Sequence, residues 1–224
     1  MKRFLRDNSL GLAFGTLFLI VLVGQAIAGH ATFNQDQLTE GLEPISFGRY
    51  ITSASFGADV AENWQSEYLQ FFLFIFLTVW LVQRGSPESK PVDERGLESD
   101  EEQKIGEYAD EHSPAWARVR GFRLALYSNS LGLVMGLIFA GSWLAQSVAG
   151  AAAYNERQLA DLQDPIGWAE YIRAPDFWNR TLQNWQSELL AVASMAILAI
   201  YLRQRGSPQS KPVGASHTAT GVEG

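Results

Sequence analysis

Residues 63–67 read NWQSE, and the same five letters return at residues 184–188, which lie 121 positions further along the chain. The same displacement carries residues 8–92 onto residues 129–213 without a gap, and roughly 35 of the 85 aligned positions are identical. The other anchors are NSLGL at residues 8–12 and 129–133 and RGSP at residues 84–87 and 205–208. The pattern indicates a tandem duplication, so the chain is predicted to be two copies of one unit.

The apolar residues gather in four stretches, at residues 10–28, 68–82, 131–149 and 189–202. The first and third hold about 19 residues without a charge, enough at about 1.5 Å per residue to cross a hydrocarbon core of about 30 Å. The second and fourth reach that length only if they begin near Trp64 and Trp185, which brings Glu67 and Glu188 into the membrane. The predicted fold class is therefore an all-α integral membrane protein with four transmembrane helices, two from each copy.

The expected domain boundaries follow the repeat. We expect a two-helix membrane unit over 1–92, an acidic linker over 93–112, a second two-helix unit over 113–214 and a disordered tail over 215–224. The linker is acidic enough to account for the formal net charge of -7 of the whole chain. The N-terminus also resembles a secretory signal, but its apolar stretch recurs inside the chain, which favours a retained helix.

Lysine and arginine are concentrated near the chain ends and around the linker, and they are sparse in the loop inside the first copy. The positive-inside rule then predicts that both termini and the linker lie in the cytoplasm. Because each unit crosses twice, the two copies have the same orientation and are expected to be related by a pseudo-twofold axis along the membrane normal. The predicted location is the bacterial inner membrane.

Several residues shared by both copies fall on one face of each predicted span. In the first spans this face holds small residues that allow close helix packing, and in the second spans it is polar. The opposite face of the second span has drifted between the copies, so Phe72 and Ile75 are expected to face lipid. The helix-packing glycines are Gly11, Gly15, Gly132 and Gly136, and the supporting polar residues are Asn63, Ser66, Asn184 and Ser187.

Counting along the helices from the cytoplasmic side places four polar side chains at one depth near the outer surface. We expect Gln25, Glu67, Gln146 and Glu188 to form an intramembrane polar ring. One interpretation is structural, with hydrogen bonds across the helices that fix the packing of the bundle. The alternative is a proton- or cation-binding site of a carrier or channel.

Between the paired spans the sequence predicts short helices on the outer face. Asn34 and Asn155 have the character of residues that cap the start of a helix. A second short helix is expected to begin at each of the prolines 44 and 165 and to end near Tyr50 and Tyr171, which are suited to the water-lipid interface.

The sequence argues against several other classes of function. It has no cysteine, which removes thiol chemistry and thiolate metal sites. His30 has Ala151 as its counterpart, so a symmetric histidine site for haem or metal is not expected. No catalytic residue, metal site or cofactor is predicted, and no nucleic-acid partner is expected. We therefore expect a protein that is not an enzyme.

The expected partners are the lipid bilayer and a second copy or another membrane protein. The segment at residues 113–123 interleaves arginine with aromatic residues. One interpretation is an amphipathic helix on anionic lipid, and the other is simple positive-inside anchoring of the third span. The basic residues of this segment are Arg118, Arg120 and Arg123.

Two copies of NWQSE, two of RGSP followed by Ser-Lys-Pro-Val, and four predicted spans together resemble an uncharacterised family of bacterial inner-membrane proteins. The resemblance covers nearly the whole chain except the linker. It implies a multipass membrane protein and lends no catalytic residues. The function expected from all these observations is a non-enzymatic scaffold or partner-binding helical bundle, with a proton- or cation-linked carrier or channel that uses Glu67 and Glu188 as the alternative.

Overall fold

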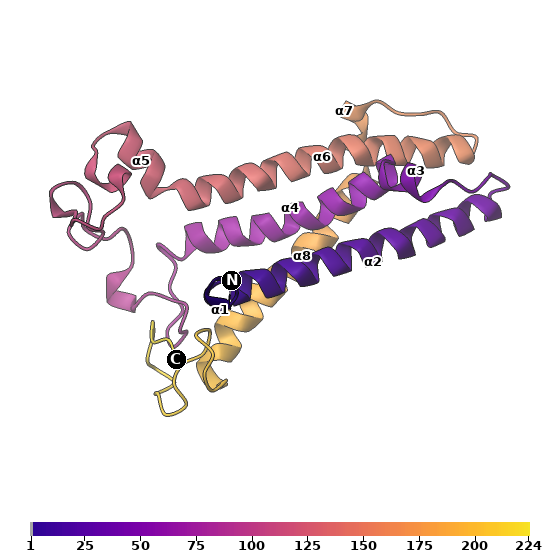
Figure 1. Ribbon diagram of the computed structural model, residues 1–224. Helices are drawn as coiled ribbons and strands as arrows, with labels where there is room; N and C mark the ends of the chain where they lie inside the picture. The colour runs from indigo at the N-terminus through magenta and orange to yellow at the C-terminus, as the bar shows by residue number, and fades with distance from the viewer. Residues whose placement is uncertain (1) are drawn as a thin grey trace. The chain divides into compact units, whose positions relative to one another are not determined.

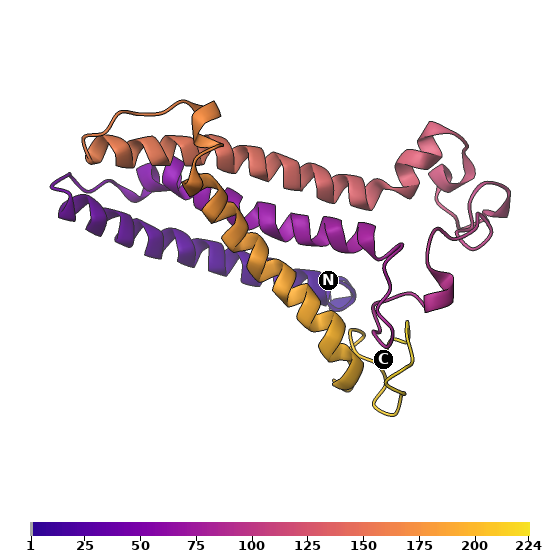
Figure 2. The same cartoon turned by 180° about the vertical axis from the view of Figure 1, so that it is seen from behind.

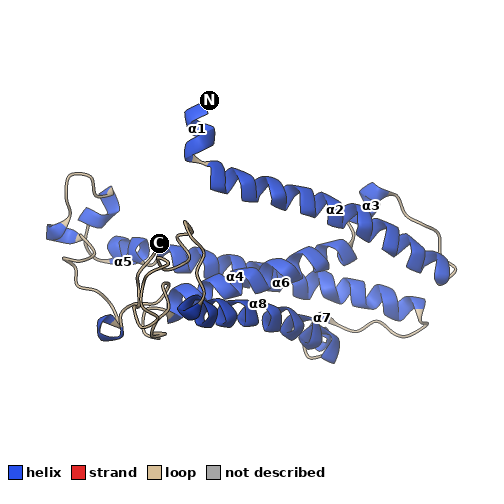
Figure 3. Cartoon of the chain, turned by 90° about the horizontal axis from the view of Figure 1, so that it is seen from below, coloured by secondary structure: helices blue, strands red, loops and turns tan. Residues whose placement is uncertain are grey.

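The computed structural model describes residues 2–224, and these residues form helices joined by loops, without a strand among them (Figure 1, Figure 3). The α-helices are α1 (Lys2–Asp7), α2 (Ser9–Thr39), α3 (Phe47–Ile51), α4 (Ala54–Leu77), α5 (Phe122–Ser128), α6 (Ser130–Ala160), α7 (Trp168–Tyr171) and α8 (Pro175–Tyr201). Three short 3₁₀ helices lie between α4 and α5: η1 (Val92–Glu94), η2 (Gly106–Tyr108) and η3 (Ala115–Arg118).

The chain divides into two compact units, and neither of them corresponds to one copy of the repeat. Unit 1 contains the chain up to Ala61 together with Ala145–Phe177, and unit 2 contains Glu62–Leu144 together with Trp178–Gly224. Each unit thus takes residues from both copies, whereas the sequence predicts domains that follow the repeat. The division falls within α4, α6 and α8, so each of these helices contributes residues to both units.

Two helices, α2 and α6, are long and apolar enough to cross a membrane. Each has 31 residues, or about 46 Å at the rise of an α-helix, which exceeds a hydrocarbon core of about 30 Å. Both continue past the predicted spans and contain Asn34 or Asn155 within their last turns, although the sequence suggests these residues as caps. The two helices support the membrane class of fold, and the four-span arrangement stays a prediction.

In unit 1 the two asparagines hold the loop that follows each long helix. The amide of Asn34 bonds to both backbone groups of Ile45, accepting from its nitrogen at 2.8 Å and donating to its oxygen at 3.0 Å. Asn155 bonds to Ile166 in the same way, with both distances 2.9 Å. These side chains satisfy backbone groups of a loop that no regular element pairs, which explains their presence in both copies.

Tyr50 and Tyr171 lie inside unit 1 rather than at an interface, with only 3% and 1% of their surface exposed. A Cβ added to Gly150 would lie 2.6 Å from the Tyr171 hydroxyl, and one added to Gly29 would lie closer still to the hydroxyl of Tyr50. Each tyrosine also packs between two aromatic rings at matching positions, Phe33 and Phe56 in the first copy and Tyr154 and Phe177 in the second. The lack of a side chain at these two glycines therefore allows a tyrosine to pack directly against the helix backbone.

In unit 2, α4 packs on α6 through the second-copy glycines. A Cβ at Gly136 would lie 3.1 Å from the ring of Phe72, and one at Gly132 would lie 3.9 Å from Ile75. Phe72 and Ile75 thus contact a helix, although the sequence predicts that they face lipid. Large residues at these two positions fill the space above the glycines, while small residues stand at the matching positions of the second copy, Ala193 and Ala196.

The first-copy glycines differ from their counterparts. Among the residues of the structure, nothing in unit 1 lies within 4 Å of a Cβ placed on Gly11 or Gly15. Both residues are exposed on α2, so the close helix contact expected there is absent within that unit.

The second helices end several residues before the RGSP motif. Helix α4 ends at Leu77 and α8 at Tyr201, and Figure 2 shows α8 as one unbroken helix that leads into the C-terminal loop. The chain turns at Gly85 and Gly206, where φ is 88° and 81°, in the left-handed region that glycine adopts without strain. RGSP therefore forms a turn that follows the helix, rather than its last residues.

The segment at residues 113–123 contains parts of two short helices instead of one amphipathic helix. Gly121, with φ of 72°, separates η3 from α5. The guanidinium of Arg118 donates to the backbone oxygens of Asp110 and Glu111, which lie just before the segment. Part of its hydrogen-bonding capacity is therefore already taken. Arg120 and Arg123 are exposed.

Candidate functional site

The four residues of the predicted ring belong to different units. Gln25 and Gln146 lie in unit 1, where Gln146 is buried and Gln25 is half-buried. Glu67 and Glu188 lie in unit 2, and their carboxyls are close enough to interact electrostatically. Glu67 is exposed and Glu188 is half-buried. The two glutamates thus belong to one unit, and the four-residue ring stays a prediction.

The supporting polar residues mostly bond to their own helices. The hydroxyl of Ser66 donates to the backbone oxygen of Asn63, and that of Ser187 donates to the backbone oxygen of Asn184, each at 2.9 Å. Such local bonds satisfy a hydroxyl inside a helix without a second helix. Of these four residues, Asn184 has a side chain that joins a network between helices.

That network is a buried ion pair between α4 and α8 in unit 2. The Arg180 guanidinium donates to one carboxylate oxygen of Glu62 at 2.6 Å, and the Asn184 amide donates to the other at 2.6 Å. Glu62 is only 9% exposed, so its charge needs both partners to remain stable away from water. We call these three residues the Glu62 cluster.

One turn along α4, a second polar pair joins the same helices. Trp185 donates from its ring nitrogen to the Gln65 side-chain oxygen at 2.7 Å, and Gln65 is fully buried. The ring of Trp185 packs against Trp143 and Phe139 of α6, with centroids 5.7 and 6.3 Å away. Gln65 and Trp185 both belong to the repeated NWQSE motif. Each copy contributes one residue to the pair, and the matching residues Gln186 and Trp64 are exposed.

The sequence analysis missed the Glu62 cluster because it selected residues that both copies share. Glu62 has Gln183 as its counterpart, and Arg180 has Asp59. The signal that would have found them is a complementary difference, with a carboxylate on one helix and a guanidinium on the other, both just before the shared NWQSE motif. A buried charge pair between two helices requires such unlike residues.

At the other end of the second helices, each copy forms the same loop from its RGSP and SKPV residues. In the first copy, Ser89 accepts from the backbone nitrogen of Gln83 at 2.8 Å, and Lys90 donates to the backbone oxygen of Gly96 at 2.7 Å. Lys90 also pairs with Glu98, which holds the pKa of that carboxyl below its usual value. We call residues 83–96 the first Ser-Lys loop.

The second Ser-Lys loop, residues 204–217, repeats these bonds and adds others. Ser210 accepts from the Gln204 nitrogen at 2.9 Å, and Lys211 donates to the backbone oxygen of His217 at 3.0 Å. The Lys211 ammonium is buried, and it donates to three further backbone oxygens, those of Gly85, Ser216 and Ala219. Burial, with the nearby charge of Arg203, lowers the pKa of Lys211.

The bond from Lys211 to Gly85 connects the two loops, and the C-terminal residues strengthen the connection. Thr220 accepts from the Gly85 nitrogen at 2.8 Å, and the Gly221 nitrogen donates to the Ser86 oxygen at 3.0 Å. The sequence predicts a disordered tail at residues 215–224, whereas these residues bond to the first loop. The physical reason is that backbone oxygens of the tail accept hydrogen bonds from the buried ammonium of Lys211. Amino-acid composition does not reveal such a partner.

No group of three histidine, aspartate or glutamate side chains within residues 2–224 is placed to hold a metal ion. Unit 2 thus contains two well-defined polar arrangements. One is the polar connection between α4 and α8, and the other is the pair of joined Ser-Lys loops. Both link the copies of the repeat.

No curated protein matches this chain, and no solved structure does. One family model matches residues 1–222, which is nearly the full length and includes both copies of the repeat. The chain therefore belongs to the DUF6766 family, which is described as a domain of unknown function.

Proposed function

We propose that this chain is a four-span protein of the bacterial inner membrane, with both termini in the cytoplasm, that acts as a non-enzymatic scaffold or partner-binding helical bundle. The observation that carries the proposal is the exposed apolar surface of α2. Leu10, Phe14 and Val21 are 72%, 67% and 67% exposed. Contiguous apolar surface of this kind is normally covered by lipid or by another protein.

The use of polar groups supports the same role. The buried carboxylate of Glu62 bonds to Arg180 and Asn184, and the buried ammonium of Lys211 bonds to backbone oxygens. These strongly polar groups hold helices and loops together. They therefore contribute to a stable framework rather than converge on a substrate.

A proton- or cation-linked carrier or channel is the second candidate. It is favoured by one observation, the electrostatic interaction between the carboxyls of Glu67 and Glu188. Like charges held near one another favour the uptake of a proton or cation.

A flux measurement separates the two candidates. Proteoliposomes with the wild type and with the double variant Glu67→Gln and Glu188→Gln are placed under a pH gradient, beside empty liposomes. We expect the scaffold to show no flux above the empty liposomes. Flux in the wild type that disappears in a folded double variant would replace the scaffold with a carrier or channel, because glutamine keeps the shape but does not titrate.

Partner binding is tested with cysteines, since the sequence has none. A cysteine at Gly15 stands on the open face of α2, and one at Ala26, which is buried in the same helix, is the matched control. Mild oxidation or a bifunctional thiol reagent in native membranes should give a product of discrete, higher mass with Gly15→Cys and none with Ala26→Cys. A monomer in both variants would contradict partner binding through this face of α2.

A further inference from the structure

We propose that the second Ser-Lys loop binds the phosphate of an anionic lipid headgroup through Arg205. The inference rests on the proposed function in one respect, the placement of α8 as a membrane span. Tyr201 is the last residue of α8, so Arg205 follows the helix by four residues. A loop at that distance from the end of a span lies at the level of the headgroups.

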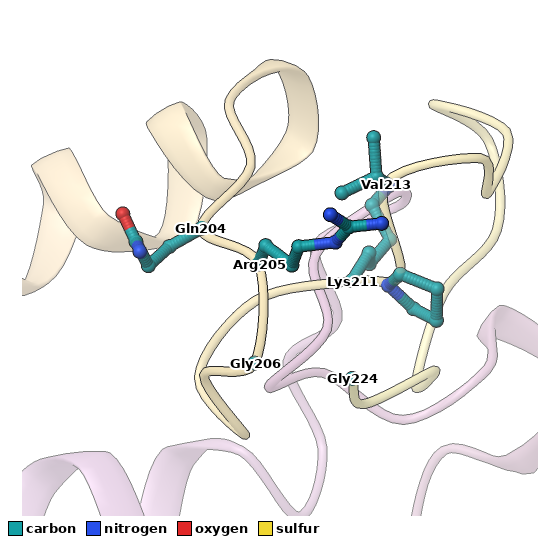
Figure 4. A pocket seen from close by; sticks show the side chains of 7 residues that line it. Gln204, Arg205, Gly206, Lys211, Val213 and Gly224 are labelled. Carbon is teal, nitrogen blue, oxygen red and sulfur yellow. The ribbon is translucent and has the colours of Figure 1, made fainter.

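The loop encloses a small, open hollow beside Arg205. Its volume is about 230 Å³, and Figure 4 shows the Arg205 side chain extending across it toward Val213. The hollow is lined by Gln204, Arg205, Gly206, Lys211, Pro212, Val213 and Gly224. None of the lining side chains is acidic, and the main-chain carboxylate of Gly224, the last residue of the sequence, also lies at the hollow.

Two cations, Arg205 and Lys211, lie in this loop, and Arg203 directly precedes it; of these three, Arg205 has its charged group open. Arg203 donates to the backbone oxygens of Ala199 and Ala215, and Lys211 is surrounded by backbone oxygens. Among residues 2–224, none forms a hydrogen bond or ion pair with the guanidinium of Arg205. A guanidinium is suited to phosphate because its planar donors bond to two oxygens at once.

The loop is held in shape before any ligand arrives. Ser210 bonds to the nitrogen of Gln204, and Lys211 fixes the residues that follow it. A preformed loop loses little conformational entropy on binding, so even one strong contact can give measurable affinity.

Apolar neighbours favour a lipid over a soluble phosphate. Tyr201, Leu202 and Val213 are 61%, 61% and 62% exposed, on both sides of Arg205 in the sequence. A free phosphate gains nothing from such groups, whereas the glycerol and upper acyl chain of a lipid can cover them. The occupant is therefore an amphiphile with an anionic head.

The first Ser-Lys loop provides a natural comparison. It has the same exposed arginine, Arg84, but carries Glu88 where the second loop has Gln209, and Val82 where the second has Arg203. Burial and the neighbouring charge of Glu223 raise the pKa of Glu88, which shows that a second carboxylate also lies near that loop. The first loop is consequently the poorer site for an anion.

The experiment measures lipid binding to the purified full chain in detergent by native mass spectrometry. The probes are phosphatidylglycerol and, as the neutral comparison, phosphatidylcholine. We expect tighter binding of phosphatidylglycerol, and a loss of about tenfold in its affinity in Arg205→Gln, because a charge-assisted contact is removed. The matched control, Arg84→Gln, removes the same charge from the first loop and should change the affinity less than about twofold.

Two further variants separate a loss of lipid binding from a loss of folding. The melting profile of each variant shows whether it is folded. Gln209→Glu introduces the carboxylate of the first loop and should weaken phosphatidylglycerol binding, while Arg205→Lys keeps the charge and should retain part of it. An equal loss of phosphatidylglycerol affinity in Arg205→Gln and Arg84→Gln would show that binding depends only on the net charge of the protein. That result would overturn the proposed site. Unchanged binding in Arg205→Gln, or equal binding of the two lipids, would overturn it as well.

Inorganic phosphate distinguishes the source of the phosphate group. If millimolar phosphate displaces phosphatidylglycerol, the site takes a soluble anion and the lipid assignment is overturned. Binding in detergent requires neither a partner nor transport. Failure of the lipid site is therefore read from this assay, whereas failure of the proposed function is read from the flux and cross-linking assays.

Discussion

Gly150 shows how one hydrogen in place of a side chain shapes a helix pair. The Tyr171 hydroxyl occupies the space that a Cβ at this position would need, and Tyr171 in turn donates to Asp176 at 3.3 Å. Gly29 and Tyr50 repeat the approach in the first copy, where Ser55 stands in place of the aspartate. A glycine is thus required at this position in both copies, whereas the hydrogen bond from the tyrosine to an aspartate is specific to the second copy.

We predict that Gly150→Ala lowers the thermal stability of the protein in detergent, by roughly 1–3 kcal/mol, because the new methyl group overlaps the tyrosine. Removing the hydroxyl with Tyr171→Phe in the same chain should recover part of the loss. Gly141→Ala, at an open position of the same helix, is the control and should be neutral or slightly stabilising. Equal loss at both glycines would contradict the close approach.

Glu88 is a second position where the copies differ, and it predicts a pH dependence. Its pKa is raised in the fold, so the folded state holds the proton more tightly than the unfolded state. Stability is then greater below the usual pKa of 4.5 and falls as the pH rises and the carboxyl ionises.

Glu88→Gln, which installs the residue of the second copy, should raise the melting temperature at pH 7 and leave it unchanged near pH 4. Glu107→Gln, in the exposed linker, is the control and should have no effect at either pH. A gain of the same size at both pH values would show that ionisation is not the cause.

At the scale of elements, the connection between α4 and α8 depends on residues that the repeat does not share. The lengths and apolar character of α2 and α6 could be predicted from composition, because a membrane span needs a run of apolar residues. The partners of Glu62 could not, since the pairing of charges is decided by which helix faces lie together. The contact between Phe72 and Gly136 was missed for the same reason.

The ion pair can be tested with a double-mutant cycle. Glu62→Gln and Arg180→Gln should each lower stability, and the pair together should lose less than the sum, with a coupling of roughly 1–3 kcal/mol. Arg180 is partly exposed, so values at the lower end are expected. Glu67→Gln, at an exposed position of the same helix, is the control and should cost under about 0.5 kcal/mol. Additive losses in the cycle would show that the two side chains do not stabilise one another.

For the whole molecule, the duplication was evident from the sequence, whereas the division into compact units was not. A repeat identifies equivalent positions, but it does not tell which copies contribute to one packed body. The tail illustrates the limit, because residues that look disordered by composition bond to a loop more than 120 residues earlier in the chain.

The membrane topology is a prediction at this scale. Reporter fusions at Gly96 and after Gly224 should both report the cytoplasm, and a fusion at Gly41 should report the outside, because the basic residues are concentrated near the chain ends and the linker. Gly41 lies in a turn with open space around it, so the insertion should not disturb packing. The same side for Gly41 and Gly96 would rule out the predicted crossing between them.

The Glu62 cluster also shows that the two copies are no longer interchangeable. In a symmetric dimer of one identical two-helix subunit, each substitution appears twice, so a glutamate at one position would have a glutamate at its mate. Here the mates are Gln183 and Asp59, and the acidic and basic members stand in different copies. Two unlike copies can therefore divide the acidic and the basic member of the pair between them. A protein built from two identical halves of either kind would lack one member of this ion pair.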